Sequence, residues 1–236
     1  MSSLKFVLKD LEFHLPAAAS RLAMRAGAID NPYGEDTERT RAIFIHIPKT
    51  AGTSLAKALS MRRGHIPAAR YRAADPARFD RYFKFCFVRN PFDRLHSAYN
   101  YLRQHADKTG HQDYDWAREH LGPYDSFEDF VLALRKPSVR AGVLRYNHFR
   151  PQHHWVRLPF GAACAMDKVG RFETLAEDYR AIAGRLDLPA ADLPVTRVGP
   201  KGGEAGDYRA VYTEPMKAIA ADIYARDLTL FGYGFA

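Results

Sequence analysis

The chain has few cysteines and no long apolar run. Its two cysteines, Cys86 and Cys164, form no CxxC pair, and the sequence shows no disulfide framework. Charged residues interrupt every apolar stretch near the N-terminus, so neither a signal-peptide core nor a membrane span is predicted there. From these absences we expect a soluble protein of a reducing, cytoplasmic compartment, or a trimmed soluble domain.

Acidic side chains are also in short supply. Lys and Arg number 35 against 27 Asp and Glu, which gives a net charge of +8 and a pI near 9.5. This excess favours an anionic ligand or substrate without identifying it. No helix-turn-helix, zinc-finger or RNA-binding signature is present, so no nucleic-acid partner is expected. A non-catalytic polyanion-binding module is one alternative that explains the charge.

The sequence does contain an alternation of strand and helix patterns. Apolar runs at 42–47 and 82–88 predict buried strands, and residues 167–173 predict a third. Helical patterns separate them, which predicts an α/β fold: a single domain with a central parallel sheet flanked by helices. We expect residues 1–40 to be an N-terminal extension and residues 41–236 to be the domain.

The sequence also predicts individual helices and one polar surface segment. The pattern predicts a helix over 53–63, a polar surface segment over 107–125, and one long closing helix over 213–235. In "RNPFDRL", Asn90 is a suitable cap and Pro91 suits the first position of a helix.

The first turn of interest lies in "AIFIHIPKTAGTSL", residues 42–55. Backbone amides at a helix start attract anions, Gly52 lets the backbone approach closely, and Lys49 adds a positive charge. The pattern therefore predicts a cradle for a phosphate or sulfate. It is not a Walker A loop, GxxxxGK[ST], because the lysine precedes the glycine. We interpret His46, inside the strand, as a core residue.

A second turn follows the second strand, in "FCFVRNPFDRLHSAY". Arg89 lies at the carboxyl end of that strand, where ligands of open α/β folds bind, and Ser97 lies two turns into the next helix. An arginine and a serine can hold a phosphate from two sides. An ion pair between Arg89 and Asp93 is the alternative. Together, the two turns would suit a nucleotide with phosphates at its 5′ and 3′ ends.

The segments "HIPKTAGTSL" and "FVRNPFDRLHSAY" resemble the two cofactor signatures of the carbohydrate sulfotransferases. The likeness is to the branch of chondroitin, dermatan and heparan uronyl 2-O sulfotransferases and their bacterial relatives. It extends to "GHIPAARYR", "FRPQHHW", "VGRFETLAEDY" and the closing segment, over residues 42–235. It implies a P-loop-like fold and transfer of a sulfuryl group from 3′-phosphoadenosine 5′-phosphosulfate (PAPS), which leaves 3′,5′-ADP (PAP).

The resemblance also assigns residues to the cofactor. Arg89 and Ser97 would bind the 3′-phosphate, and a basic loop with Lys201 would fold over the nucleotide. Lys49 would neutralise the bridging oxygen during in-line displacement. We expect no metal, because a sulfonate carries less charge than a γ-phosphate. The residues assigned to the 5′-phosphosulfate are Lys49, Thr50, Ala51, Gly52, Thr53 and Ser54.

A sugar hydroxyl needs a proton acceptor before it can attack sulfur. His65 follows the first helix, in a loop expected to return over the cradle, where related uronyl sulfotransferases keep a base. Imidazole titrates near neutral pH, which suits a general base. A plain surface histidine is the alternative, and His153, His154 and Glu173 are the rival bases.

The acceptor is expected to be a carbohydrate, and an acidic poly- or oligosaccharide would match the charge of the chain. A P-loop kinase using ATP is the competing hypothesis, disfavoured by the missing Walker A lysine and by the lack of a recognisable Mg²⁺-binding acid. Adjacent His153 and His154 lack the spacing of a zinc site. The sequence predicts no particular oligomeric state. Candidates for acceptor contacts are Arg70, Arg150, Gln152, His153, His154 and Glu173.

Overall fold

The structure is a computed structural model in which two compact units are distinguished. The first contains Met1–Arg89 and Gln152–Pro194, and the second contains Asn90–Pro151 and Val195–Ala236. The predicted boundary at residue 41 stays a prediction. The residues that the structure describes are 13, 15–62, 64–104, 110–158, 163–189, 193 and 207–235.

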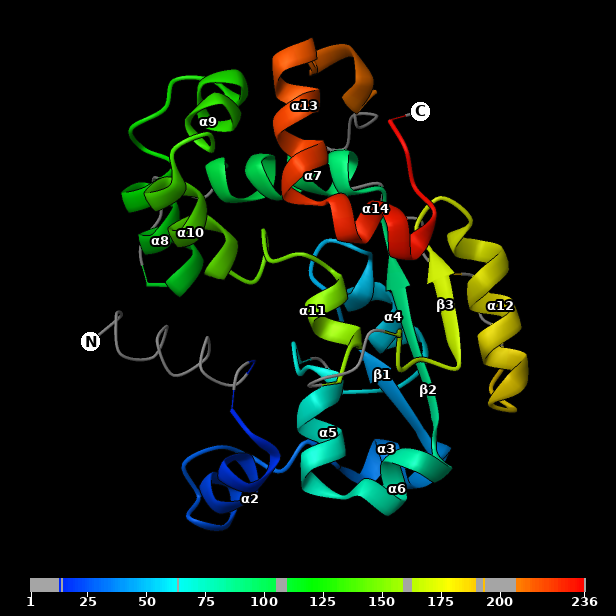
Figure 1. Ribbon diagram of the computed structural model, residues 1–236. Coiled ribbons are helices and arrows are strands. Elements are labelled where there is room, and N and C mark those ends of the chain that lie inside the picture. The colour runs from blue at the N-terminus through cyan, green and yellow to red at the C-terminus, as the bar shows by residue number, and fades with distance from the viewer. Residues whose placement is uncertain are drawn as a thin grey trace. The chain divides into compact units, whose positions relative to one another are not determined.

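A three-stranded parallel sheet forms the centre of the first unit (Figure 1). Its strands are β1 (Ala42–Ile45), β2 (Phe83–Val88) and β3 (Lys168–Arg171), in the order β1-β2-β3. Every residue of β1 is buried, as is typical of parallel strands covered on both faces. The predicted α/β fold with a parallel sheet is confirmed.

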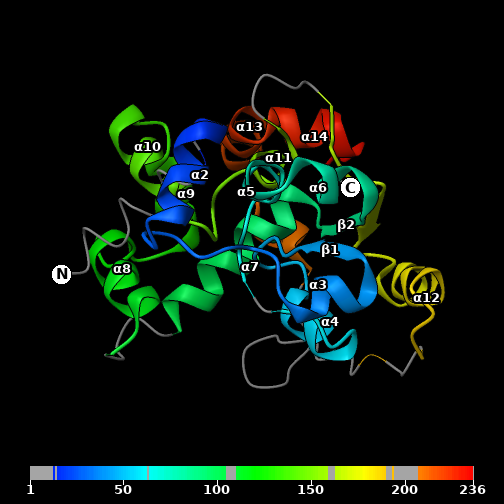
Figure 2. The same ribbon diagram turned by 90° about the horizontal axis from the view of Figure 1, so that it is seen from below.

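Helices cover both faces of this sheet (Figure 2). In that view α4 lies on one side of β1 and β2, and α5 and α11 lie on the other. The helices of the first unit are α2 (Ala17–Arg25), α3 (Glu35–Thr40), α4 (Gly52–Ala58), α5 (Ala68–Ala74), α6 (Pro76–Arg81), α11 (His153–Val156) and α12 (Leu175–Arg185).

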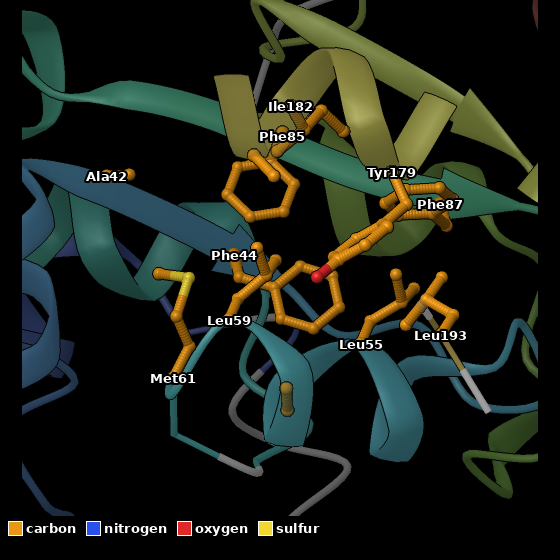
Figure 3. Packing of buried hydrophobic residues seen from close by; sticks show 12 residues of the cluster. Ala42, Phe44, Leu55, Leu59, Met61, Phe85, Phe87, Tyr179, Ile182 and Leu193 are labelled. Carbon is orange, nitrogen blue, oxygen red and sulfur yellow. The ribbon is translucent and has the colours of Figure 1, made fainter. Parts of the chain in front are cut away.

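An apolar cluster joins the sheet to α4 and α12 (Figure 3). The rings of Phe44 on β1 and Phe85 on β2 stack with centroids 5.0 Å apart, and Leu55 of α4 is fully buried in the same cluster. At Gly170 on β3, a Cβ would lie 2.6 Å from the ring of Phe87, so only glycine leaves room for that ring. Burying each such large side chain contributes about 1.5–3 kcal/mol.

The described part of the predicted extension packs on α5. Arg21 of α2 donates to the carbonyl of Ala73 at 3.5 Å. The hydroxyl of Tyr33 lies 3.2 Å from the carbonyl oxygens of both Tyr71 and Asp75, and burial raises the pKa of Tyr33 above its ordinary value. These residues therefore belong to the packing of the first unit.

The described residues of the second unit form helices and loops. Helix α7 starts as predicted, because the side chain of Asn90 accepts from the N–H of Phe92 at 3.0 Å and Pro91 takes the first position. No helix in the described ranges is long and apolar enough to cross a membrane. The helices are α7 (Pro91–Arg103), α8 (Gln112–His120), α9 (Phe127–Ala133), α10 (Pro137–Arg145), the 3₁₀ helix η2 (Tyr208–Val211), α13 (Glu214–Ile223) and α14 (Ala225–Phe231).

Two predictions of helix extent were wrong. The helix expected over 53–63 ends at Ala58, because Ser60 adopts a left-handed conformation with φ 50°. The closing helix expected over 213–235 breaks at Tyr224, whose φ of −106° and ψ of 18° are not helical. The Tyr224 hydroxyl donates to the carbonyl of Phe149 at 2.8 Å, which holds this buried residue in place.

The polar surface segment expected over 107–125 was also wrong in part, because it contains α8. Trp116 of this helix is buried, and its ring stacks on Tyr146 with centroids 4.0 Å apart. Contact between Trp116 and Tyr146, which lies 30 residues further along the sequence, helps to bury one face of a helix whose sequence is mostly polar.

Candidate active site

The turn between β1 and α4 has an unusual backbone. Lys49 (φ 71°) and Ala51 (φ 62°) are both left-handed, a region that residues other than glycine rarely adopt. Alternation of left- and right-handed residues points backbone N–H groups to one side, and such nests bind anions. The Thr50 hydroxyl donates to the carbonyl of Ile47 at 2.9 Å and closes the turn from within. This strained conformation falls where the sequence predicts the cradle.

The position of the His46 ring is the reason that residue 52 of this turn is glycine. A Cβ at Gly52 would lie 1.8 Å from the imidazole of His46, so any side chain there would displace the ring. His46 is 5% exposed, and its ring stacks on Phe44 with centroids 5.7 Å apart. The interpretation of His46 as a core residue is confirmed, and its ring also supports the cradle.

Helix α4 is shorter than predicted, with seven residues. A short helix has a weaker dipole. The charge of Lys49 and the N–H groups of the loop therefore account for a larger share of the attraction for an anion than the sequence suggested. Lys49, Ala51 and Ser54 are half-buried, Thr50 is buried, and Thr53 is exposed.

His65 lies beside the cradle, as its predicted loop position required. Its Nδ1 is 2.9 Å from the carbonyl oxygen of His46, and the two imidazole centroids are 4.3 Å apart. Because a carbonyl oxygen only accepts, Nδ1 carries the proton in this contact, and the neutral ring has its lone pair at Nε2. The ring also meets Trp155 edge-on, with centroids 5.9 Å apart. The geometry suits a base, and the role of His65 stays a prediction.

Arg89 connects the second turn to the first. Its Nη1 donates to the carbonyl of Lys49 at 3.3 Å, and its Cζ lies 4.0 Å from the centroid of the Phe172 ring. The amide of Gln152 binds the main chain of Arg89 on both sides, accepting from its N–H at 3.0 Å and donating to its carbonyl at 2.8 Å. The carboxyl end of β2 is thus tied to the turn that follows β1.

The two signature turns and the segments quoted after them fall within one match to a known family. The sequence profile of the sulfotransferase family matches residues 36–234. The chain belongs to the sulfotransferase family. The resemblance seen in the sequence is confirmed at this level.

One curated relative of this sulfotransferase is carbohydrate sulfotransferase 14 of Homo sapiens. It is 22% identical over 225 residues, which cover 84% of this chain and 59% of the relative. The chain therefore spans less than two thirds of the length of that relative. No solved structure matches the sulfotransferase.

Arg89 and Ser97, which the resemblance assigns to the same 3′-phosphate, fall in different units of the sulfotransferase. Ser97 lies half-buried on α7 of the second unit, whereas Arg89 is the last residue of this part of the first unit. Their predicted cooperation around one phosphate stays a prediction. Lys201 and its loop lie outside the described residues.

Three of the predicted acceptor contacts are buried and hydrogen-bonded to backbone groups. Arg70 is 7% exposed and donates to the carbonyl of Asp30. Arg150, in the second unit, is 3% exposed and donates to the carbonyl of Arg145 at 2.7 Å. Gln152 is fully buried. These contacts give all three a structural role, and acceptor binding by them is untested.

The remaining predicted acceptor contacts are His153, His154 and Glu173, of which the last two are exposed. His153 is buried and His154 is exposed on α11, with ring centroids 4.3 Å apart, and Glu173 is exposed just after β3. Within the described ranges, no group of three or more His, Cys, Asp or Glu side chains is arranged to hold a metal ion. The expectation of a metal-free reaction stays a prediction.

Sequence reasoning missed Phe172, the aromatic partner of Arg89. The available signal was its position in "VGRFE", near the carboxyl end of the third predicted strand, which lies at the same edge of the sheet as the end of β2. It also assigned Gln152 to the acceptor, because "FRPQHHW" contains no pattern that links it to Arg89.

Proposed function

We propose that this sulfotransferase moves a sulfuryl group from PAPS to a hydroxyl of a carbohydrate acceptor. The observation that carries the proposal is the contact of Arg89 with the carbonyl of Lys49 at 3.3 Å, because it joins the two turns that the resemblance assigns to the cofactor. Membership of the family supports sulfuryl transfer, and the printed name of the human relative supports a carbohydrate acceptor.

The residues of the cradle fit a phosphosulfate. Gly52 has no Cβ on the side of His46, and the positive φ angles of Lys49 and Ala51 support a nest of backbone N–H groups in this turn. Thr53 and Ser54 add hydroxyl donors. We infer that this strand-turn-helix is P-loop-like, that it binds the 5′-phosphosulfate, and that PAPS supplies the sulfuryl group when bound. Following the resemblance, Arg89 and Ser97 would bind the 3′-phosphate, and Lys201 would cover the nucleotide.

His65 would act as the general base. Its Nδ1 proton is directed to the His46 carbonyl, so Nε2 is the atom that would accept the proton of the sugar hydroxyl. The backbone carbonyl thus fixes both the tautomer and the orientation of the ring. A histidine whose ring contacts only solvent has neither of these fixed.

Lys49 would stabilise the negative charge that develops on the bridging oxygen as the S–O bond breaks. Electrostatic stabilisation at the atom that gains charge is usually the largest catalytic contribution. The left-handed backbone of Lys49 and the bond from Arg89 to its carbonyl hold the start of this side chain in place.

The acceptor would meet the exposed candidates, His154 and Glu173. A net charge of +8 favours an acidic polysaccharide. Arg70 and His153 of the first unit and Arg150 of the second unit stay candidates for acceptor contacts, as the resemblance suggests.

Transfer of radiolabelled sulfate from PAPS tests the proposal. Purified protein is incubated with chondroitin, dermatan, heparan and neutral polysaccharides, with and without EDTA. We expect label in at least one acidic polysaccharide and no effect of EDTA. Transfer of phosphate from ATP that depends on Mg²⁺, with none from PAPS, would overturn the proposal. PAP at a hundred times its Kd should also stabilise the fold by about 2.7 kcal/mol.

A further inference from the structure

We infer that Gln152 and Phe172 are positioning residues that hold Arg89 ready for the 3′-phosphate of the cofactor. Through Arg89 they would set the preference of the enzyme for PAP over AMP, which differs from PAP only by lacking that phosphate. This inference rests on the proposed function, because it takes Arg89 as a 3′-phosphate ligand.

Gln152 acts on the main chain of Arg89. Its amide exchanges two hydrogen bonds with that residue, at 3.0 Å and 2.8 Å, just as two paired residues do in a β-ladder. The strand β2 ends one residue earlier, at Val88. The side chain thus continues the hydrogen-bond pattern of the sheet by one residue.

The chemistry of an amide is needed at this position. Gln152 is fully buried, so both its oxygen and its nitrogen must find partners, and Arg89 provides both. Glutamate has the same shape but lacks the donor for the Arg89 carbonyl. Asparagine has both groups on a shorter side chain. The contact therefore depends on glutamine itself rather than on any buried polar residue.

Phe172 acts on the guanidinium of Arg89. The Arg89 Cζ lies 4.0 Å from the ring centroid, which is the distance of a close cation–π contact. The N–H of Phe172 donates to the carbonyl of Val88 at 2.7 Å, and β2 and β3 pair Val88 with Arg171. The register of the sheet therefore places the ring, and the ring places the guanidinium.

The Lys49 carbonyl provides a further fixed point, at 3.3 Å from Nη1. A free arginine side chain has many rotamers, and ordering it when a ligand binds costs conformational entropy. Arg89 is held at its main chain, over its guanidinium plane and at one nitrogen before any ligand arrives. Preorganisation of this kind raises affinity without a new contact to the ligand. A guanidinium can also serve several acceptors at once, which suits a phosphate.

The experiment compares the affinities of PAP and AMP by titration calorimetry. The variants are Gln152→Glu, Phe172→Leu and Phe172→Tyr, with Gln104→Ala as the matched control, since Gln104 is exposed after the end of α7. We expect Gln152→Glu and Phe172→Leu to lower the affinity for PAP about tenfold and to change that for AMP less than about twofold. Phe172→Tyr restores the aromatic face and should restore the preference, and the control should equal the wild type.

Melting curves of each variant without ligand separate positioning from general damage. An equal loss of PAP and AMP affinity, with a lowered melting temperature, would show a merely structural role and overturn the inference. If Gln152→Glu does not fold, the Phe172→Leu and Phe172→Tyr pair decides. A wild type that prefers PAP, with variants that keep that preference, would overturn the inference and leave the proposed function standing. A wild type that binds PAP and AMP equally would instead contradict the assignment of Arg89 in the proposed function.

Discussion

Each unit of the molecule contains a polar cluster, and the two are built from different groups. In the first unit, the Arg89 cluster consists of Arg89, Lys49, Gln152 and Phe172. Its side chains bond to backbone: Gln152 to the main chain of Arg89, and Arg89 to the carbonyl of Lys49. These contacts fix positions without neutralising a charge.

In the second unit, the Asp113 cluster joins side chains to a side chain. Tyr101 donates to Oδ2 of Asp113 at 3.2 Å, Tyr146 donates to Oδ1, and His148 lies 3.5 Å from Oδ2. Burial by itself would raise the pKa of Asp113, but the hydrogen bonds from His148 and Tyr146 and the charge of His111 hold it well below its ordinary value. Burial, together with the charge of Asp113 and the hydrogen bond to it, raises the pKa of Tyr101 to about 12.

This difference indicates a stabilising role for the Asp113 cluster and a ligand-binding role for the Arg89 cluster. A carboxylate surrounded by donors has its charge satisfied within the fold, so its removal should cost stability and leave binding unchanged. A cation and a turn whose positions are fixed by contacts to backbone groups would serve to place a ligand, so changes there should affect binding and turnover first. The following variants test this division, beginning with the largest expected effect.

His65→Asn should lower turnover about 10²–10⁴-fold, the usual contribution of a general base. Asparagine keeps an N–H donor for the His46 carbonyl but cannot take up a proton at neutral pH. Single-turnover transfer from PAPS measures the loss, and PAP affinity should stay within about twofold of the wild type. His120→Asn, on α8 of the second unit, is the matched control. Full turnover in His65→Asn would move the base to another residue.

Lys49→Ala should lower kcat about 10²–10³-fold, the effect of removing one group that stabilises developing charge. PAP affinity should fall far less, because the backbone of the cradle remains. Lys57→Ala, an exposed lysine of α4, serves as control. Equal losses in kcat and in PAP affinity would assign Lys49 to binding alone. Both parameters come from steady-state transfer and calorimetry.

Asp113→Asn should lower the free energy of unfolding at pH 7 by about 1.5–3 kcal/mol, the range for hydrogen bonds to a charged group. The pKa of Asp113 is depressed in the fold, so its contribution is present above the ordinary carboxyl value, about 3.9, and is lost as the pH falls below it.

Denaturant titrations from pH 7 to pH 3 measure that dependence, which should be weaker in Asp113→Asn than in the wild type. Asp115→Asn is the control, because its carboxylate is 47% exposed and pairs with Arg118 on the surface of the same helix. The division between the clusters predicts unchanged PAP affinity in both variants. A tenfold weaker PAP affinity in Asp113→Asn would contradict this division of roles.

Gly52→Ala should destabilise the fold by about 1–3 kcal/mol, since the added Cβ meets the ring of His46 at 1.8 Å. The gain in helix propensity from alanine offsets part of this cost. The double variant His46→Ala, Gly52→Ala should recover stability relative to Gly52→Ala, because the ring that clashes is gone. Thermal melting of the single and double variants measures the coupling, and strictly additive losses would contradict the contact.

Two strands of the first unit and the start of α7 in the second unit could be predicted from local pattern. The runs at 42–47 and 82–88 gave β1 and β2 because fully buried strands need continuous apolar sequence, and Asn90 with Pro91 gave the start of α7. The turn around Gly52 was recognised as a candidate anion cradle because small residues and a lysine follow a buried strand, and anion binding there stays a prediction.

The supports of the site could not be predicted in this way. Gln152 binds Arg89 across 63 residues of sequence, and nothing in the periodicity of either segment encodes that pairing. The left-handed residues Lys49, Ala51 and Ser60 are not glycines, so composition gave no warning of them, and the early end of α4 was missed for that reason. Tertiary contacts decide such positions.

The order of the chain through the two units also affects how the protein is made. The first unit is interrupted between Arg89 and Gln152 by part of the second. At about 5–20 residues per second, the ribosome completes Gln152 roughly 3–13 s after Arg89, since 63 residues separate them. A nascent chain that ends before Gln152 already contains the whole cradle but has no amide to hold Arg89. If Gln152 positions Arg89 as proposed, selectivity for the nucleotide would be acquired late in synthesis, after the strands that carry both signatures have been made.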